Sequence, residues 1–168
     1  MLNLSPFGLF HTVLGLVAVG AGIYAFFRHG KIGYATKPGR LFIWMTIVTC
    51  VTGLFIFHHG GFGKPHVLSI ATLVVLVVAY WAELRQCRQR WALYLATASY
   101  SLAFFLHFIP GFTETLTRIP LGAPWASSPD DPKLAMLIGG AFLVFLAGLA
   151  FQLVRLRLNQ QSVALQKP

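Results

Sequence analysis

Five of the six histidines are the side chains in this sequence best suited to hold a metal ion or haem. They are His11, His58, His59, His66 and His107. Each lies at or near an end of an apolar segment, and neutral imidazole is the commonest protein ligand for metals and also binds haem iron. If the apolar segments cross a membrane in alternating directions, these five ends meet at one face. We therefore predict a histidine-built site at that face.

The composition predicts the membrane crossings that this site requires. The 168 residues are 57% hydrophobic and only 10% charged, with a mean hydropathy of +0.71, whereas soluble domains carry about 25% charged residues. Apolar stretches of about 18 residues or more are typical of transmembrane helices. Five are present, at about 7–27, 40–58, 66–83, 91–109 and 134–154. We predict one all-α domain over 1–168, a polytopic membrane helix bundle with five transmembrane helices.

The positions of the basic residues predict how the bundle is oriented. Ten of the thirteen lysines and arginines fall in the connections on one side, together with His29. These are Arg28, Lys31, Lys37, Arg40, Arg85, Arg88, Arg90, Arg155, Arg157 and Lys167. The positive-inside rule then puts the amino terminus outside and the carboxy terminus in the cytoplasm, and we expect a multi-pass protein of the bacterial inner (cytoplasmic) membrane. Nucleic-acid binding is not expected, because no basic residue alternates with exposed stacking aromatics.

Two kinds of site are compatible with the histidines. A haem b site needs two facing imidazoles and room for the ring; His11 lies between Gly8 and Gly15, and His66 or His107 could face it. A copper, iron or zinc site needs three or four ligands, which His58, His59 and His66 could supply together with His11 or His107. The plainer alternative is that these histidines only occupy the polar headgroup zone. Helix packing alone also explains the small residues beside His11.

The longest connection, 110–133, emerges beside the predicted site and could act as a lid. Residues Thr113 to Arg118 could form a short surface helix in which Glu114 and Arg118 stand four apart, the spacing of a helical ion pair. Glu114 is the one nearby carboxylate candidate for a general base. No other acid or cysteine joins the histidines, so the sequence assigns no catalytic residue.

Several motifs resemble those of a known family. They are His11-Thr-Val-Leu-Gly15, Gly39-Arg40-Leu, Thr52-Gly53-Leu54, Gly60-Gly61-Phe62-Gly63-Lys-Pro-His66 and Thr113-Glu-Thr-Leu-Thr-Arg-Ile-Pro. Over most of the first four predicted helices the chain looks like a group of small bacterial inner-membrane proteins defined by a domain of unknown function. The resemblance implies a polytopic membrane protein and no particular activity. The four-helix arrangement with histidines near helix ends more loosely resembles b-type cytochromes, although a second histidine set at the opposite face is missing.

These observations lead to three hypotheses of different classes. The first is a redox-related membrane protein that binds haem b or a transition metal and exchanges electrons with a quinone or a larger membrane complex. The second is a non-catalytic accessory or scaffold subunit whose glycine faces pack against larger partners. The third is a metal or small-solute carrier, which is disfavoured because ionisable residues are missing at mid-membrane depth.

Overall fold

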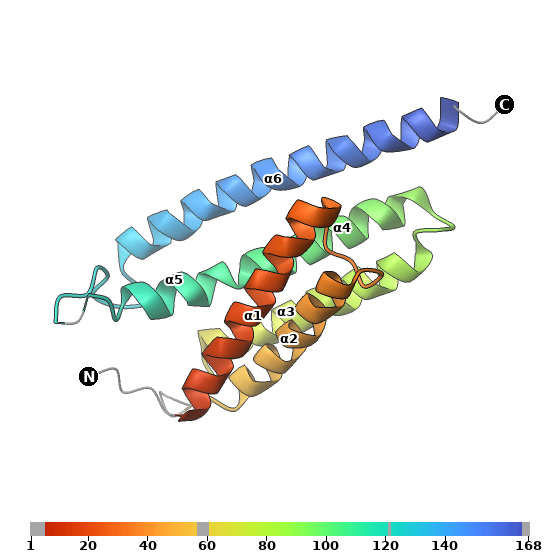
Figure 1. Cartoon of the computed structure of the whole chain (residues 1–168). Coiled ribbons are helices and arrows are strands. Elements are labelled where there is room, and N and C mark those ends of the chain that lie inside the picture. Colours follow the sequence, from red (N-terminus) through yellow and green to blue (C-terminus); the bar gives the residue numbers. More distant parts are fainter. Residues whose placement is uncertain (1–5, 57–60, 121, 166–168) are drawn as a thin grey trace.

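The protein is all-helical over the residues that the computed structural model describes, which are 6–56, 61–120 and 122–165. Six helices follow one another along the chain. They are α1 (Pro6–His29), α2 (Lys37–Leu54), α3 (Lys64–Arg85), α4 (Arg90–Leu106), α5 (Phe108–Leu116) and α6 (Pro132–Leu165). Helices α4 and α5 continue one another, so the six helices make five rods (Figure 1).

The rods alternate in direction, as the sequence pattern predicts. One end of the bundle gathers the starts of α1, α3 and α6 with the ends of α2 and α5, and we call it the histidine end (Figure 1). The opposite end holds the connections 30–36 and 86–89 and the last turns of α6, and we call it the basic end. Ends that are far apart in sequence are therefore neighbours in space.

Four helical segments are long and apolar enough to cross a membrane. They are Pro6–His29, Lys64–Arg85, Arg90–Leu116 and Pro132–Gln161. Each corresponds to a predicted span, but the span predicted at 40–58 does not join them. Its counterpart α2 begins with Lys37-Pro-Gly-Arg40 and ends at Leu54, so polar residues lower the mean hydropathy of its 18 residues. Its last predicted residues, 57 and 58, lie outside the described residues.

Small side chains allow α1 to pack closely against its neighbours. Ala18, Ala21 and Ala25 of α1 are buried. A Cβ added at Gly22 would lie 2.6 Å from Cδ2 of Phe104, and one at Gly15 would lie 3.7 Å from Cγ2 of Thr49. The small face of α1 therefore receives α2 and an aromatic ring of α4. Room for a haem ring and helix packing were the two roles predicted for this face, and the structure shows helix packing.

A proline separates α4 from α5. Pro110 has no N–H, so the carbonyl of Leu106 loses its partner four residues on, and the helix is interrupted at His107. Helix α5 then carries the chain to Leu116. The predicted surface helix at Thr113 to Arg118 is thus the end of a longer element that continues α4, and the non-helical connection is shorter than 110–133.

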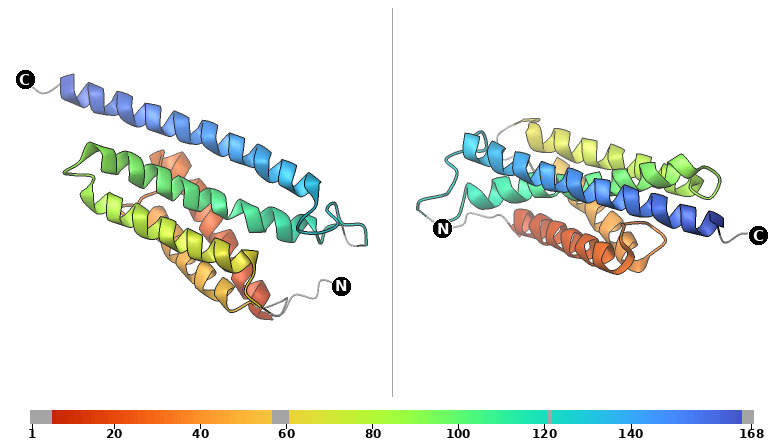
Figure 2. Two further views of the ribbon diagram at one scale, coloured as in Figure 1. Left: turned by 180° about the vertical axis from the view of Figure 1, so that it is seen from behind. Right: turned by 90° about the horizontal axis from the view of Figure 1, so that it is seen from above.

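Helix α6 lies along the outer side of α4 and α5 (Figure 2). Only 6% of its most apolar window is buried, against 44% for the α4–α5 rod. Two hydrogen bonds attach it to α4, from Ser101 Oγ to Gln152 Oε1 over 2.8 Å and from the Tyr94 hydroxyl to Gln160 Oε1 over 3.3 Å. It runs well past the predicted span end at residue 154.

One carboxylate organises the basic end. Glu83 of α3 accepts hydrogen bonds from the backbone N–H groups of Tyr34 and Ala35, at 2.9 and 3.2 Å, and from the hydroxyl of Tyr100 at 2.7 Å. The connection between α1 and α2 is thereby fixed to α3 and α4. Tyr100 is only 1% exposed, so its hydroxyl has its partner supplied inside the protein.

Candidate functional site

His11 is held against α2 by a threonine. Its Nδ1 lies 3.0 Å from Oγ1 of Thr52, and that hydroxyl also lies 2.9 Å from the carbonyl of Val48 and 3.0 Å from that of Thr49. In the tautomer that carries the ring proton on Nδ1, His11 donates to Thr52 while the Thr52 hydroxyl donates its one proton to a backbone carbonyl, and Nε2 of His11 keeps its lone pair.

His107, at the break between α4 and α5, is held in the same tautomer. Its Nδ1 lies 2.9 Å from the carbonyl of Ala103, which can only accept, so Nδ1 carries the proton. Its Nε2 then accepts a hydrogen bond from Oγ1 of Thr46 over 3.3 Å. Phe42 packs beside the imidazole, with the ring centroids 5.7 Å apart.

Glu114 lies at the same end of the bundle as the two imidazoles. Glu114 in turn forms a salt bridge with Arg118, as their spacing predicts. The histidine end thus holds His11 of α1, His107 at the α4–α5 junction and Glu114 of α5. The Nε2 lone pairs of the two histidines are its candidate ligands.

His66 has a different role in the fold. Its Nδ1 accepts a hydrogen bond from the backbone N–H of Gly63, the N-cap of α3, over 3.2 Å. An accepting Nδ1 places the ring proton on Nε2, the opposite tautomer to His11 and His107. Gly63 has no side chain, so the histidine supplies the one side-chain bond of this helix start. The ring is 4% exposed and stacks on Phe62 at 5.3 Å.

Gly53 lets α1, α2 and α3 come together beside His11. A Cβ at this position would lie 3.1 Å from Cε1 of His11 and 3.1 Å from Oγ of Ser69. Ser69 is one helical turn after His66, so α3 contributes to the wall of the same region. The predicted ligands His58 and His59 lie outside the described residues. Within the described ranges, no three His, Cys, Asp or Glu side chains are grouped closely enough to hold one metal ion.

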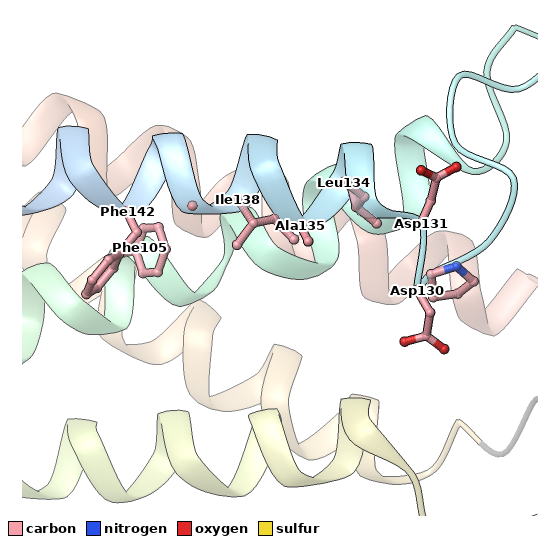
Figure 3. A pocket seen from close by; sticks show the side chains of 9 residues that line it. Phe105, Asp130, Asp131, Leu134, Ala135, Ile138 and Phe142 are labelled. Atoms are coloured by element: carbon pink, nitrogen blue, oxygen red, sulfur yellow. The ribbon is translucent and has the colours of Figure 1, made fainter.

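A second feature lies on the other side of α4. A groove of about 580 Å³ runs between α4 and the first turns of α6 (Figure 3). It is lined by Phe105, Pro129, Asp130, Asp131, Leu134, Ala135, Ile138, Gly139 and Phe142. Asp131 accepts bonds from Ser127 and Lys133, and Asp130 pairs with Lys64, so neither carboxylate is committed to the groove. Phe105 is two residues before His107 and points to a nearly opposite side of the helix, so the groove is separate from the histidines.

The sequence pattern did not identify Thr46 and Thr52 as partners of the histidines. They stand with Thr49 at three-residue intervals on α2, which is a usable signal for one polar helix face. Comparison of the chain with models of known protein families, with curated proteins and with solved structures returned no match. The arguments for function therefore rest on the fold and on the geometry of this site.

Proposed function

We propose that this is a multi-pass protein of the bacterial inner membrane that binds haem b, or a transition metal, through His11 and His107 and takes part in electron transfer. The membrane location is supported by the four apolar helices and by the separation of basic residues from histidines. On the positive-inside rule the basic end is cytoplasmic and the histidine end faces outward.

The observation that carries the cofactor proposal is the shared tautomer of the two imidazoles. Histidines that ligate metals usually donate their other ring N–H to a carbonyl or similar acceptor, which fixes the ring and raises the basicity of the ligating nitrogen. His11 has Thr52 for this purpose and His107 has the carbonyl of Ala103. Two such nitrogens match the axial ligand set of haem b better than a bare ion, which needs three or four ligands.

The roles of the surrounding residues follow from this assignment. His11 and His107 would hold the haem b, which would supply one-electron redox chemistry when bound. Thr52 and Ala103 orient the imidazoles. Thr46 is hydrogen-bonded to Nε2 of His107, so its hydroxyl would have to release that nitrogen for a ligand to bind there. Glu114 supplies a negative charge that would offset positive charge at the site. The electron partner would be a quinone or a larger membrane complex.

The test is an absorption spectrum together with elemental analysis of the detergent-purified protein. We expect a Soret band or stoichiometric copper, iron or zinc in the wild type, and its loss in His11→Ala and in His107→Ala. His29→Ala, at the basic end, is the matched control and should retain the bound group. Thermal unfolding of each variant separates loss of a ligand from loss of the fold. A wild type with neither a Soret band nor stoichiometric metal would overturn the proposal.

A second candidate is a non-catalytic accessory subunit, and α6 is the feature that favours it. Added Cβ atoms at Gly139, Gly140 and Gly148 would meet nothing within 4 Å, so another helix could approach this backbone closely. This candidate predicts that Gly140→Leu with Gly148→Leu disrupts assembly with a partner, as judged by the size of the purified complex. It also predicts that the double variant His11→Ala with His107→Ala assembles with the partner as the wild type does. The haem proposal makes no such prediction about assembly.

A further inference from the structure

The basic end of the bundle carries far more positive charge than the protein itself can neutralise. The chain has four acidic residues, and only Glu83 belongs to this end. Its carboxylate is already engaged by two backbone N–H groups and the Tyr100 hydroxyl. The salt bridges found among the described side chains, Lys64 with Asp130 and Arg118 with Glu114, both lie at the histidine end. Among the described residues, no further carboxylate offsets the positive charge of the basic end.

Arg155 of α6 lies beside the connection between α1 and α2, next to the residue that precedes Lys31. The guanidinium Nη1 of Arg155 lies 3.2 Å from the position of a Cβ on Gly30, whose φ of +72° forms the turn after α1. Lys31 is the next residue. Burial lowers the pKa of its ammonium, and the charge of Glu83 only partly opposes this. A further anion beside Lys31 would favour its charged form.

The placement of this pair also matters for the fold. Helix α6 is attached to α4 by the bonds of Gln152 and Gln160, and it is largely unburied. An anion held jointly by Lys31 and Arg155 would attach α6 to the α1–α2 connection as well. Trp81 and Trp91 lie at this same end of the bundle, with ring centroids 5.8 Å apart, and the guanidinium of Arg85 stacks on Trp81 at 3.8 Å. Such aromatic residues are typical of the depth at which lipid headgroups lie.

We propose that Lys31 and Arg155 bind the phosphate of an anionic phospholipid, which fastens α6 to the connection between α1 and α2. The proposal rests on the membrane location given above, but it is independent of haem or metal binding. A lipid headgroup is favoured over a soluble anion because a membrane places phosphates permanently at this depth, next to a cluster of cations. Basic pockets between transmembrane helices bind anionic lipids in this way.

The experiment measures lipid binding by the full-length protein. Wild type is reconstituted into vesicles of phosphatidylcholine alone, and of phosphatidylcholine mixed equally with phosphatidylglycerol, and its thermal unfolding is followed in both. Binding of phosphatidylglycerol to the detergent-solubilised protein is titrated by native mass spectrometry. Lys31→Gln, Arg155→Gln and the double variant remove the proposed contacts. Arg88→Gln, in the 86–89 connection of the same end, is the matched control for total charge.

We expect the wild type to unfold at a higher temperature with phosphatidylglycerol than without it. Each single variant should bind this lipid about fivefold more weakly and the double variant more weakly than either, whereas Arg88→Gln should change binding less than twofold. Equal losses in Arg88→Gln and Arg155→Gln would overturn the site, since they would indicate a diffuse charge effect. Equal stabilisation by inorganic phosphate would overturn the lipid assignment.

The result can be separated from the fate of the proposed function. A protein that does not enter vesicles contradicts the membrane location and this inference together. A protein that enters vesicles but unfolds at the same temperature with and without phosphatidylglycerol contradicts only the lipid site. If Arg155→Gln fails to fold, Lys31→Gln set against Arg88→Gln gives the same comparison, because each of these variants removes one positive charge.

Discussion

The hydroxyl of Tyr100 donates a hydrogen bond to Oε2 of Glu83 over 2.7 Å, and this contact joins α4 to α3 at the basic end. The same carboxylate accepts the backbone N–H groups of Tyr34 and Ala35. A single acidic side chain thus fixes three parts of the chain relative to one another. Because α2 begins directly after this connection, Glu83 also helps to set the position of Thr46 and Thr52 on α2.

Removing this contact should destabilise the protein in two graded steps. Tyr100→Phe removes one hydrogen bond to a charged acceptor and should lower the free energy of unfolding by about 1.5 to 3 kcal/mol. Glu83→Ala should cost more, because it also leaves two backbone N–H groups without their acceptor. Thermal unfolding in detergent measures both. Glu114→Ala, whose carboxylate is largely exposed, should have little effect on stability, and an equal loss there would contradict this explanation.

The two threonines of α2 should have opposite effects on the proposed cofactor site. Thr52→Val removes the acceptor for Nδ1–H of His11 and should weaken binding of the group by about 10- to 100-fold. Thr46→Val removes the hydroxyl that competes for Nε2 of His107, so binding should be unchanged or stronger. Both changes keep the shape of the side chain. Reconstitution titrated by the Soret band or by metal content measures the affinity, and equal loss in both variants would contradict the tautomer assignment.

Two glycines of α1 provide a test of helix packing. Gly22→Ala places a methyl group 2.6 Å from Phe104, so we expect a loss of about 1 to 3 kcal/mol from overpacking. Gly20→Ala meets nothing within 4 Å and should stabilise α1 by up to about 1 kcal/mol, because alanine favours the helix. Unfolding temperatures of the two variants should therefore shift in opposite directions. Shifts of the same sign would show that α1 packs differently.

The start of α6 should make stability depend on pH under acidic conditions. Asp131 accepts hydrogen bonds from the backbone N–H and hydroxyl of Ser127 and from the backbone N–H of Lys133. These bonds favour the carboxylate and hold the pKa of Asp131 below its usual value of 3.8. A lowered pKa in the folded state adds stability that is complete above the unfolded-state pKa and is lost as the pH falls through the folded-state pKa.

Asp131→Asn should remove this contribution. The variant should be less stable than the wild type at neutral pH, and the difference should shrink as the pH falls from about 5 to 3. Unfolding temperature measured across that range checks the prediction. Asp130→Asn is the control, because its exposed ion pair with Lys64 contributes little. A constant difference between Asp131→Asn and the wild type would show that the carboxylate charge is not the cause.

The sequence by itself determined the helical class, the four apolar segments long enough to cross a membrane and the division into two chemically different ends. Length, hydropathy and the order of charges along the chain are local properties, so one sequence is enough to read them. The ion pair of Glu114 and Arg118 was also predictable, because partners four residues apart share one helix face. The span predicted at 40–58 is not among these four, because α2 ends at Leu54 and the polar residues at its start lower its mean hydropathy.

Only the tertiary structure decided what each histidine contacts. Thr52 is 41 residues from His11 and Thr46 is 61 residues from His107, and these pairs meet because of the rotation and depth of each helix in the bundle. Hydropathy does not set rotation or depth; packing of small residues such as Gly22 and Gly53 does. The same packing made His66 the cap of α3 and left Nε2 of His11 and His107 as candidate ligands. These three side chains are chemically identical, so their positions in the sequence alone could not predict which role each one has.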